Sequence, residues 1–260
     1  SRGLGDVYKR QAYTADGFYR AFLWTQARGM KALKGFFRSG ATAASSEGIV
    51  IVGGGLSAGQ WRAFRYASDS GETEECGMLG GAESMAFGVS ENGAVVVGRA
   101  QNAAGQWRVF RWMQNERKME DLGRLGGSGS GAFGVSADGT VVVGAAQNSS
   151  GRQRAFLWTP SEGMRDLGTL GGAASRALRV SADGSVVVGR AQDASGQWRA
   201  FVWTENQGMQ DLNVLCADQL SEGAFLVCAR AVSADGRFIV GYGNNAATGR
   251  KEGFLLQWRE

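Results

Sequence analysis

This chain of 260 residues contains no histidine, so the first side chains to consider for chemistry are its carboxylates, amides and three thiols. The absence of histidine excludes the commonest general base, the Ser-His-Asp and Cys-His arrangements and most catalytic zinc sites. An active site would need two carboxylates in one pocket, as in glycoside hydrolysis. The acids that lie outside the repeat described below have no spacing that indicates such a pair: Glu72, Glu74, Glu75, Asp218 and Glu222.

We therefore expect a protein without catalytic activity, and a carboxylate-based carbohydrate-active enzyme is the alternative. We also expect no metal site and no cofactor. Each Asp-Gly turn of the chain offers one carboxylate, whereas a calcium site needs several oxygen ligands around one ion. The double glycines do not open a helix after a strand, so they form no phosphate loop. We expect them to let the chain turn from one repeated unit to the next at Gly80-Gly81, Gly126-Gly127 and Gly171-Gly172.

Pairs of polar residues recur after four of the apolar runs. The pairs stay polar while their letters change, which is typical of loops that carry recognition on a rigid scaffold. Amide side chains suit neutral polar partners such as glycans or peptide backbone. The alternative is that each residue caps the end of a strand and faces water. As a set they are the predicted ligand-binding residues: Gln101, Asn102, Gln147, Asn148, Gln192, Asp193, Asn244 and Asn245.

The three cysteines divide by position. Cys76 aligns with apolar strand residues in other copies of the repeat, so we expect a buried free thiol. Cys216 and Cys228 flank a stretch where one interval of the repeat is 52 residues, against 45 for the interval before it. An inserted loop with a cysteine near each end predicts a disulfide, which an exported protein could form. Such a bridge would stabilise the fold by about 3 kcal/mol in the chain-entropy account.

A repeat of about 45 residues must position these side chains. One marker is a short aromatic strand such as AFLW, whose phenylalanine recurs at intervals of 42, 46, 46, 45 and 53 residues. The other marker is a decapeptide such as VSADGSVVVG, whose turn glycine recurs at intervals of 45, 46, 45 and 52 residues, at Gly48, Gly93, Gly139, Gly184 and Gly236. Because two independent markers keep the same period, the chain is built from repeated units.

Each unit is predicted to form four short strands. In the copy that begins at 177, we expect strands at 177–182, 185–191, 197–204 and 209–215. Asp183-Gly184 is the expected two-residue turn between the first two strands, and both central residues of such a turn take positive φ. Three consecutive valines in the second strand predict that both of its faces are buried. The segments are short and rich in β-branched residues, which argues against helices.

Four strands in about 45 residues, apolar on both faces, predict the blade of a β-propeller in an all-β protein. Blades stack face to face and bury the surfaces that a single blade leaves exposed. A solenoid or a pair of sandwiches is the alternative. We expect one propeller domain over 12–260, with about five complete blades and a partial one, as a fragment of a six- or seven-bladed ring. The expected units are 12–40, 41–81, 82–127, 128–172, 173–215 and 216–260.

The first eleven residues, SRGLGDVYKRQ, match nothing in the repeat and resemble the translated remnant of a sequencing adaptor. We therefore set 1–11 apart from the domain. Arg2, Lys9 and Arg10 against Asp6 give this segment two of the chain's four net positive charges. The charge is thus weak evidence for nucleic acid, and we expect no nucleic-acid partner. No run of 18 apolar residues occurs, so we expect no membrane-spanning helix, and we expect a monomer.

The unit [A/V]-F-x-W-T…G-M-x-D-L-G-x-L-G-G…V-S-A-D-G-x-V-V-V-G, over residues 12–260, resembles the HAF family of extracellular repeats. The resemblance implies an exported bacterial protein, extracellular or on the outer-membrane surface, built from repeats and not catalytic; some family members are autotransporter-like. The family often has histidine before Ala-Phe, whereas this chain has other residues at that position. A role of that histidine in the family therefore does not transfer to this chain. The corresponding residues here are Arg20, Arg62, Arg108, Arg154 and Arg199, with Glu252 in the last copy.

Two sets of repeated residues admit a functional and a structural interpretation. The repeated tryptophans Trp61, Trp107 and Trp198 could stack on sugars or bases, but we expect them to pack between blades. The repeated arginines could bind an acidic ligand. Because residues present in every blade usually build the blade, we expect structural ion pairs with acids on the adjoining fourth strand: Glu75, Asp121, Asp166 and Asp211.

These patterns predict a binding or adhesion scaffold for a glycan or protein partner. The loops that join the second to the third strand, with the long insertion between Cys216 and Cys228, are the expected binding face. The opposite end carries the short Asp-Gly turns, which leave little room for variation.

Overall fold

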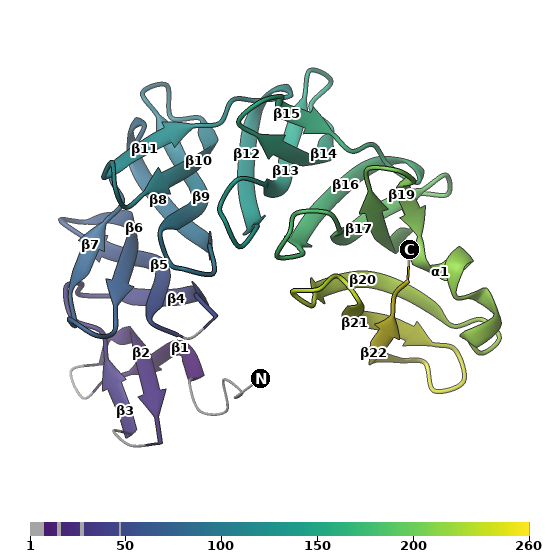
Figure 1. The fold of residues 1–260 in the computed structure, drawn as a ribbon, viewed down its shortest axis with the longest axis horizontal. Helices are drawn as coiled ribbons and strands as arrows, with labels where there is room; N and C mark the ends of the chain where they lie inside the picture. Colours follow the sequence, from purple (N-terminus) through teal and green to yellow (C-terminus); the bar gives the residue numbers. More distant parts are fainter. Residues whose placement is uncertain (1–7, 15–16, 27–28, 47, 260) are drawn as a thin grey trace. The chain divides into compact units, whose positions relative to one another are not determined.

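The computed structural model describes residues 8–14, 17–26, 29–46 and 48–259, and the side chains from residue 12 on. The described part of the chain is all-β: its 22 strands form six antiparallel sheets, and its helical segments are the short α1 (Leu212–Leu215) and η1 (Ala217–Gln219) (Figure 1). The predicted all-β class and the antiparallel order of the strands are confirmed. The chain divides into two compact units, Ser1–Leu122 and Gly123–Glu260.

The first unit holds three sheets in which consecutive strands pair. The first has three strands and the other two have four. Their strands are β1 (Tyr8–Tyr13), β2 (Tyr19–Thr25) and β3 (Gly29–Ala32); β4 (Ser39–Ala44), β5 (Val50–Ser57), β6 (Gln60–Ala67) and β7 (Thr73–Glu75); and β8 (Gly80–Val89), β9 (Val95–Asn102), β10 (Trp107–Met113) and β11 (Lys118–Asp121).

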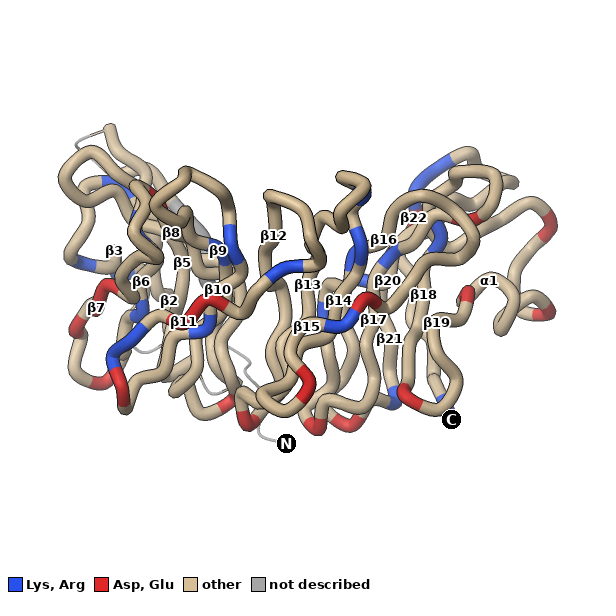
Figure 2. The backbone as a smooth tube through the Cα atoms, turned by 90° about the horizontal axis from the view of Figure 1, so that it is seen from above, with Lys and Arg blue, Asp and Glu red and all other residues tan. Residues whose placement is uncertain are grey.

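The second unit repeats this plan with two four-stranded sheets and one three-stranded sheet. In Figure 2 its acidic residues lie mostly in the loops and at the ends of strands. Its strands are β12 (Gly126–Val135), β13 (Val142–Asn148), β14 (Gln153–Thr159) and β15 (Gly163–Asp166); β16 (Gly171–Val180), β17 (Val187–Asp193), β18 (Trp198–Thr204) and β19 (Gly208–Asp211); and β20 (Phe225–Val232), β21 (Phe238–Asn245) and β22 (Arg250–Gln257).

The core lies between neighbouring sheets within each unit. Val187 faces one apolar cluster, with Leu157 and Phe201, while Val186 and Val188 face the next cluster, with the β20–β22 sheet. The three valines are 7%, 0% and 0% exposed in sequence order. The prediction that this strand is buried on both faces is confirmed.

The predicted two-residue Asp-Gly turn is wrong. Gly184 has a φ of 81°, but the residues other than glycine with positive φ are Ala58 and Arg117, so Asp183 is not in that conformation. The loop instead closes through Ser181, whose N–H donates to the carbonyl oxygen of Val186 and whose hydroxyl accepts from the N–H of Val186. The Ser181 hydroxyl and the Ser185 N–H donate to Asp183 and hold the pKa of that carboxyl below its ordinary value.

Three of the first strands, β8, β12 and β16, begin at a double glycine, and β16 is longer than the strand expected at 177–182. β16 begins at Gly171, with a φ of 100°, so the chain does turn there as predicted. A Cβ on Gly172 would lie 2.4 Å from the carbonyl oxygen of Asp193. The second glycine is therefore required by the close approach of backbone at the end of β17.

The ends of the chain depart from the expected boundaries. The fourth strand expected at 209–215 ends at Asp211, whose carboxylate caps α1 by accepting from the N–H of Asn213. β1 pairs with β2 in continuous register, so 8–11 lie in a strand although we set them apart from the domain. The origin of 1–11 stays a prediction. Among the described residues, no helix has the length and apolar character that a membrane span needs.

Buried serines tie neighbouring sheets together, which the sequence analysis missed. The hydroxyl of Ser175, on β16, accepts from the N–H of Ala155 at 2.8 Å and donates to the carbonyl oxygen of Gly168. Ser84 makes the same pair of bonds in the first unit, to Ala63 and Gly77. These bonds satisfy backbone groups that the stacking of sheets would otherwise leave unpaired.

Candidate functional site

The predicted binding loops are held by their own polar residues. At the end of β9, the side-chain oxygen of Asn102 accepts from the N–H groups of Ala104 and Gln106 in the following loop, at 3.1 and 3.0 Å. Asn148 accepts in the same way from Ser150 and Arg152. The second residue of these pairs thus closes its own hairpin, as Asx residues do in turns.

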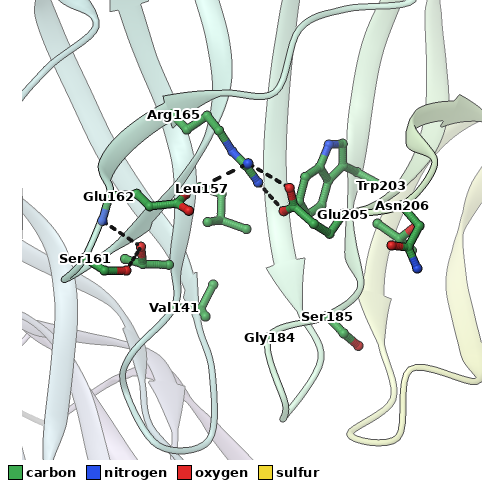
Figure 3. A pocket seen from close by; sticks show the side chains of 12 residues that line it. Val141, Leu157, Ser161, Glu162, Arg165, Gly184, Ser185, Trp203, Glu205 and Asn206 are labelled. Atoms are coloured by element: carbon green, nitrogen blue, oxygen red, sulfur yellow. Dashed lines mark hydrogen bonds and ion pairs between the residues drawn. The ribbon is translucent and has the colours of Figure 1, made fainter.

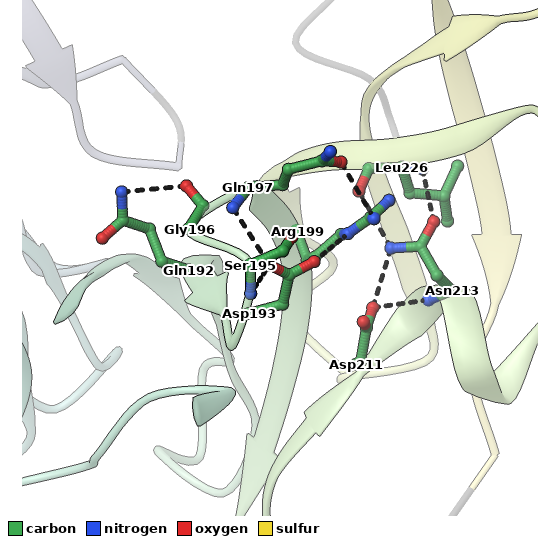
Figure 4. A network of polar contacts seen from close by, with 9 residues as sticks. All are labelled: Gln192, Asp193, Ser195, Gly196, Gln197, Arg199, Asp211, Asn213 and Leu226. Carbon is green, nitrogen blue, oxygen red and sulfur yellow. Dashed lines mark hydrogen bonds and ion pairs between the residues drawn. The ribbon is translucent and has the colours of Figure 1, made fainter. Parts of the chain in front are cut away.

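Asp193 closes its hairpin in the same way and also forms an ion pair (Figure 4). Its carboxylate accepts from the N–H groups of Ser195 and Gln197 and from the Nε of Arg199 at 2.8 Å. The hydroxyl of Ser195 and the guanidinium of Arg199 hold the pKa of Asp193 far below its ordinary value. Asn245 likewise accepts from Ala247 at 2.9 Å. The structural interpretation therefore describes the second residue of all four pairs.

The first residues of the four pairs differ in the hydrogen bonds that their side chains make. Gln147 accepts from the N–H of Gly129, and Gln192 donates to the carbonyl oxygen of Gly196. Among the described residues, the side chains of Gln101 and Asn244 make no hydrogen bond. These two amides are available to a ligand.

Asn244 lies in a pocket of about 170 Å³ in the second unit. One wall is the end of the inserted loop, from Gln219 to Leu226, and the other is formed by β21 and β22. The polar side chains that line it include Asn244, Asn245 and Glu252, and its aromatic rings are Phe225 and Phe254. The structure thus brings the predicted pair of the last unit together with the insertion; the other three pairs belong to other sheets.

Glu252 is fixed at the edge of this pocket. One carboxylate oxygen accepts from the Nδ2 of Asn245 at 2.9 Å, and the other accepts from the hydroxyl of Thr248 at 3.0 Å. Glu252 stands where other units have an arginine, so the last unit alone places a carboxylate here. The residue was visible in the sequence as the exception to the repeated arginine.

The inserted loop is anchored by Asn213 and not by a disulfide. The side chain of Asn213 accepts from the N–H of Leu226 at 2.6 Å and donates to the carbonyl oxygen of Leu226 at 3.0 Å, across 13 residues (Figure 4). Its Nδ2 also donates to Asp211. This amide therefore joins the two ends of the insertion.

The predicted disulfide between Cys216 and Cys228 is absent from the structure, where both are free thiols. Cys216 ends α1, whereas Cys228 is buried inside β20 with its Sγ 3.7 Å from the carbonyl oxygen of Ala229. Cys76 is a buried free thiol, as predicted. Burial raises the pKa of all three thiols.

We expect all three thiols to be countable by alkylation without a reductant. In the native protein at neutral pH, half-exposed Cys216 should react first and Cys76 and Cys228 should stay protected, because burial and a raised pKa both lower the reactive thiolate fraction. After denaturation, intact mass should show three added groups. One added group in the denatured, unreduced protein would mean that Cys216 and Cys228 are joined.

The repeated arginines form the expected ion pairs in part. Arg62 lies 4.0 Å from Glu75 and Arg154 lies 3.8 Å from Asp166, as predicted. Arg199 pairs with Asp193 and not with Asp211, because Asp211 caps α1.

The repeated tryptophans are covered by arginines of their own units. The guanidinium of Arg99 lies 4.3 Å from the ring centre of Trp107, and that of Arg190 lies 4.4 Å from the ring centre of Trp198. These cation–π contacts join the second and third strands of one sheet and stabilise it. The packing of these rings between blades stays a prediction.

A second and larger hollow lies at the end that we expected to leave little room. It has a volume of about 280 Å³ and lies between the β12–β15 and β16–β19 sheets of the second unit (Figure 3). Arg165 and Glu205 face each other across it, with Leu157 and Trp203 behind them. The sequence signal was Leu157, which stands where Arg65 and Arg111 stand in other units.

Comparison with known proteins shows the fold and no family. No family model matches the chain, and no curated protein matches it. The chain is similar to the solved structure of TolB from Acinetobacter baumannii, with a TM-score of 0.62 and 13% identity over 97% of this chain and 61% of that one. A putative TolB from Agrobacterium tumefaciens gives a TM-score of 0.56 and 13% identity, over 97% and 90% of the two chains.

A prolyl endopeptidase structure is similar as well, with a TM-score of 0.57 and 12% identity over 98% of this chain and 49% of that one. At such identities the likeness concerns the fold alone. It supports a β-propeller-like arrangement of the sheets, as the repeat predicted.

Proposed function

We propose that the protein is a non-catalytic binding module of a bacterial surface protein, and that the pocket beside the insertion recognises a glycan. In this proposal each sheet is a propeller blade, and the six sheets are part of a six- or seven-bladed ring. An extracellular or outer-membrane location follows from the resemblance to the HAF repeats. The module acts as a monomer.

The observation that carries the proposal is the meeting of Asn244 and Glu252 with Phe225 and Phe254 in one pocket. Amide and carboxylate groups bind sugar hydroxyls as donors and acceptors, and aromatic rings pack against the apolar face of a sugar. Glu252 is held in place by Asn245, so this acceptor is ordered before a ligand arrives. The side chain of Asn244 is free to rotate toward the ligand.

The volume indicates what part of a ligand the pocket holds. It is smaller than the roughly 300–1,000 Å³ of pockets that enclose whole drug-sized ligands. The pocket therefore suits one terminal sugar of a longer chain, with the rest of the glycan lying over the insertion.

The carbohydrate-active alternative needs two carboxylates on either side of the scissile bond, one of them with a raised pKa. Glu252 is the acid among the described residues that line this pocket. The second carboxylate that this mechanism needs is absent from the described residues that line the pocket. A bound glycan would therefore meet one carboxylate and not the pair that hydrolysis requires.

We expect the wild-type protein to bind a defined subset of a glycan array and to release no product from it. In Asn244→Ala, affinity for the best glycan should fall about tenfold, because one hydrogen bond to the ligand is lost. Gln101→Ala is the matched control, since it removes a free amide from the equivalent loop of another sheet. Isothermal titration of the three proteins measures the effect. Equal affinity of Asn244→Ala and wild type would contradict the site, and hydrolysis of the glycan would contradict the function.

A further inference from the structure

The larger hollow of the second unit has an apolar floor and a charged rim. Val141, Leu157 and Trp203 form the floor, and Arg165, Glu162 and Glu205 lie at the rim (Figure 3). We call this hollow the turn-end groove. It is separate from the pocket at Asn244, because the two are lined by different loops.

The first unit shows what fills the equivalent groove there. Arg65, on β6, stands at the position of Leu157 on β14 and is 8% exposed. Its Nε donates to the carbonyl oxygen of Gly93 at 2.9 Å, and its Nη2 donates to the side-chain oxygen of Gln114 at 3.2 Å. A guanidinium on an aliphatic stem therefore occupies this place between the β4–β7 and β8–β11 sheets.

The two grooves are built on the same frame. A Cβ on the turn glycine Gly93 would lie 2.4 Å from Val50, and a Cβ on Gly184 would lie 2.6 Å from Val141. Gly184 thus takes the place of Gly93. Glu205, which follows the third strand by the same spacing, takes the place of Gln114. The grooves share this glycine and valine frame and differ in the charged side chains around it. Leu157, Arg165 and Glu205 stand where the first unit has Arg65, Glu74 and Gln114.

The charge of the turn-end groove suits a cation. Leu157 brings no guanidinium, and Glu205 replaces the neutral Gln114 with a carboxylate. Both Nη atoms of Arg165 donate to Glu205, and Arg165 also lies 3.9 Å from Glu162. The hydrogen bond from Arg165 holds the pKa of Glu205 below its ordinary value. Two carboxylates and one guanidinium leave one net negative charge at the rim.

We propose that the turn-end groove binds an arginine side chain of a partner protein, in the place that Arg65 occupies in the first unit. The aliphatic stem of the arginine lies along Leu157 and Val141. Its guanidinium donates to Glu205 and to the carbonyl oxygen of Gly184. This site is independent of the glycan pocket and gives the module a second, protein-directed contact.

Arginine fits this groove better than lysine. The two acceptors that hold Arg65 are bonded by different nitrogens of one planar group, Nε and Nη2. A guanidinium presents donors in such a fixed fork, whereas an ammonium is a compact point charge.

The test uses acetyl-arginine amide, acetyl-lysine amide and acetyl-citrulline amide as probes, in NMR titrations of the full chain. Citrulline keeps the shape of arginine and lacks its charge. We expect the arginine probe to shift the amide signals around Gly184 and Glu205 and to bind about tenfold more tightly than citrulline, because bonds to charged groups are the stronger ones. Equal binding of arginine and citrulline would overturn the proposal.

Two variants locate the site. Leu157→Arg should fill the groove from within, as Arg65 does, and remove binding of the arginine probe. Glu205→Gln recreates the Gln114 arrangement and should weaken binding about tenfold by removing the net charge. Glu252→Gln, with the same charge change in the other pocket, is the control and should leave arginine binding unchanged. If Leu157→Arg does not fold, Glu205→Gln decides: unchanged affinity in that variant would overturn the proposal.

Discussion

Replacing Gly189 by alanine is expected to destabilise the protein by about 3 kcal/mol or more. A Cβ at this position would lie 2.0 Å from the carbonyl oxygen of Arg176 and 2.9 Å from the ring of Phe201. The oxygen belongs to backbone and cannot rotate away. The register between β16 and β17 shifts between Ala177 and Arg179, and this bulge brings the first strand onto the glycine.

The same contact recurs in the other units, since a Cβ on Gly98 or Gly144 would lie 2.1 Å from a backbone oxygen. Gly129→Ala, on β12 of the neighbouring sheet, is the matched control. Its Cβ would approach the side chain of Gln147 at 3.3 Å, and that side chain can move. Urea unfolding should show a change within about 0.5 kcal/mol for the control. Equal stability of Gly189→Ala and Gly129→Ala would contradict the bulged contact.

Replacing Ser175 by alanine is expected to cost about 1–3 kcal/mol, because the N–H of Ala155 would be buried without a hydrogen-bond partner. Ser175 is fully buried, and its hydroxyl also donates to Gly168. The loss should loosen the contact between the β12–β15 and β16–β19 sheets and leave the strands of each sheet paired.

Hydrogen exchange of the Ala155 amide measures this effect directly and should accelerate in Ser175→Ala. Ser150→Ala is the control, since Ser150 is exposed and its hydroxyl makes no hydrogen bond among the described residues. An Ala155 amide that exchanges as slowly in Ser175→Ala as in wild type would show that the serine does not tie the sheets together.

The period of the repeat predicted the sheets because glycine and valine positions carry strong local information. Gly184 takes the positive φ expected of it, and Val187 and Val188 are buried on opposite faces as a run of valines requires. The dipeptide Asp-Gly alone did not predict which type of turn forms. The type of turn depends on the hydroxyl of Ser181, two residues earlier, which closes a longer loop.

The candidate site was predicted in part. The sequence placed Asn244 near the insertion, and the structure confirms that they share a pocket. The sequence could not assign different roles to Asn244 and Asn245, because both side chains are amides. Only the contacts in the structure show that Asn245 binds Glu252. The predicted disulfide was wrong for a similar reason, since the spacing of the cysteines alone could not reveal that Asn213 already joins the ends of the loop. The turn-end groove follows from Leu157 and Glu205, which stand where the first unit has Arg65 and Gln114, and their effect depends on the neighbouring sheet.

The central claim is that the pocket between the insertion and β21–β22 binds a glycan without transforming it. The most direct measurement is an NMR titration of the full chain with the best glycan from the array, followed residue by residue. The account predicts shifted amides between Gln219 and Leu226 and between Gly243 and Phe254, with the spectrum of the glycan unchanged over days. Shifts confined to other loops, or new sugar signals from cleavage, would contradict it.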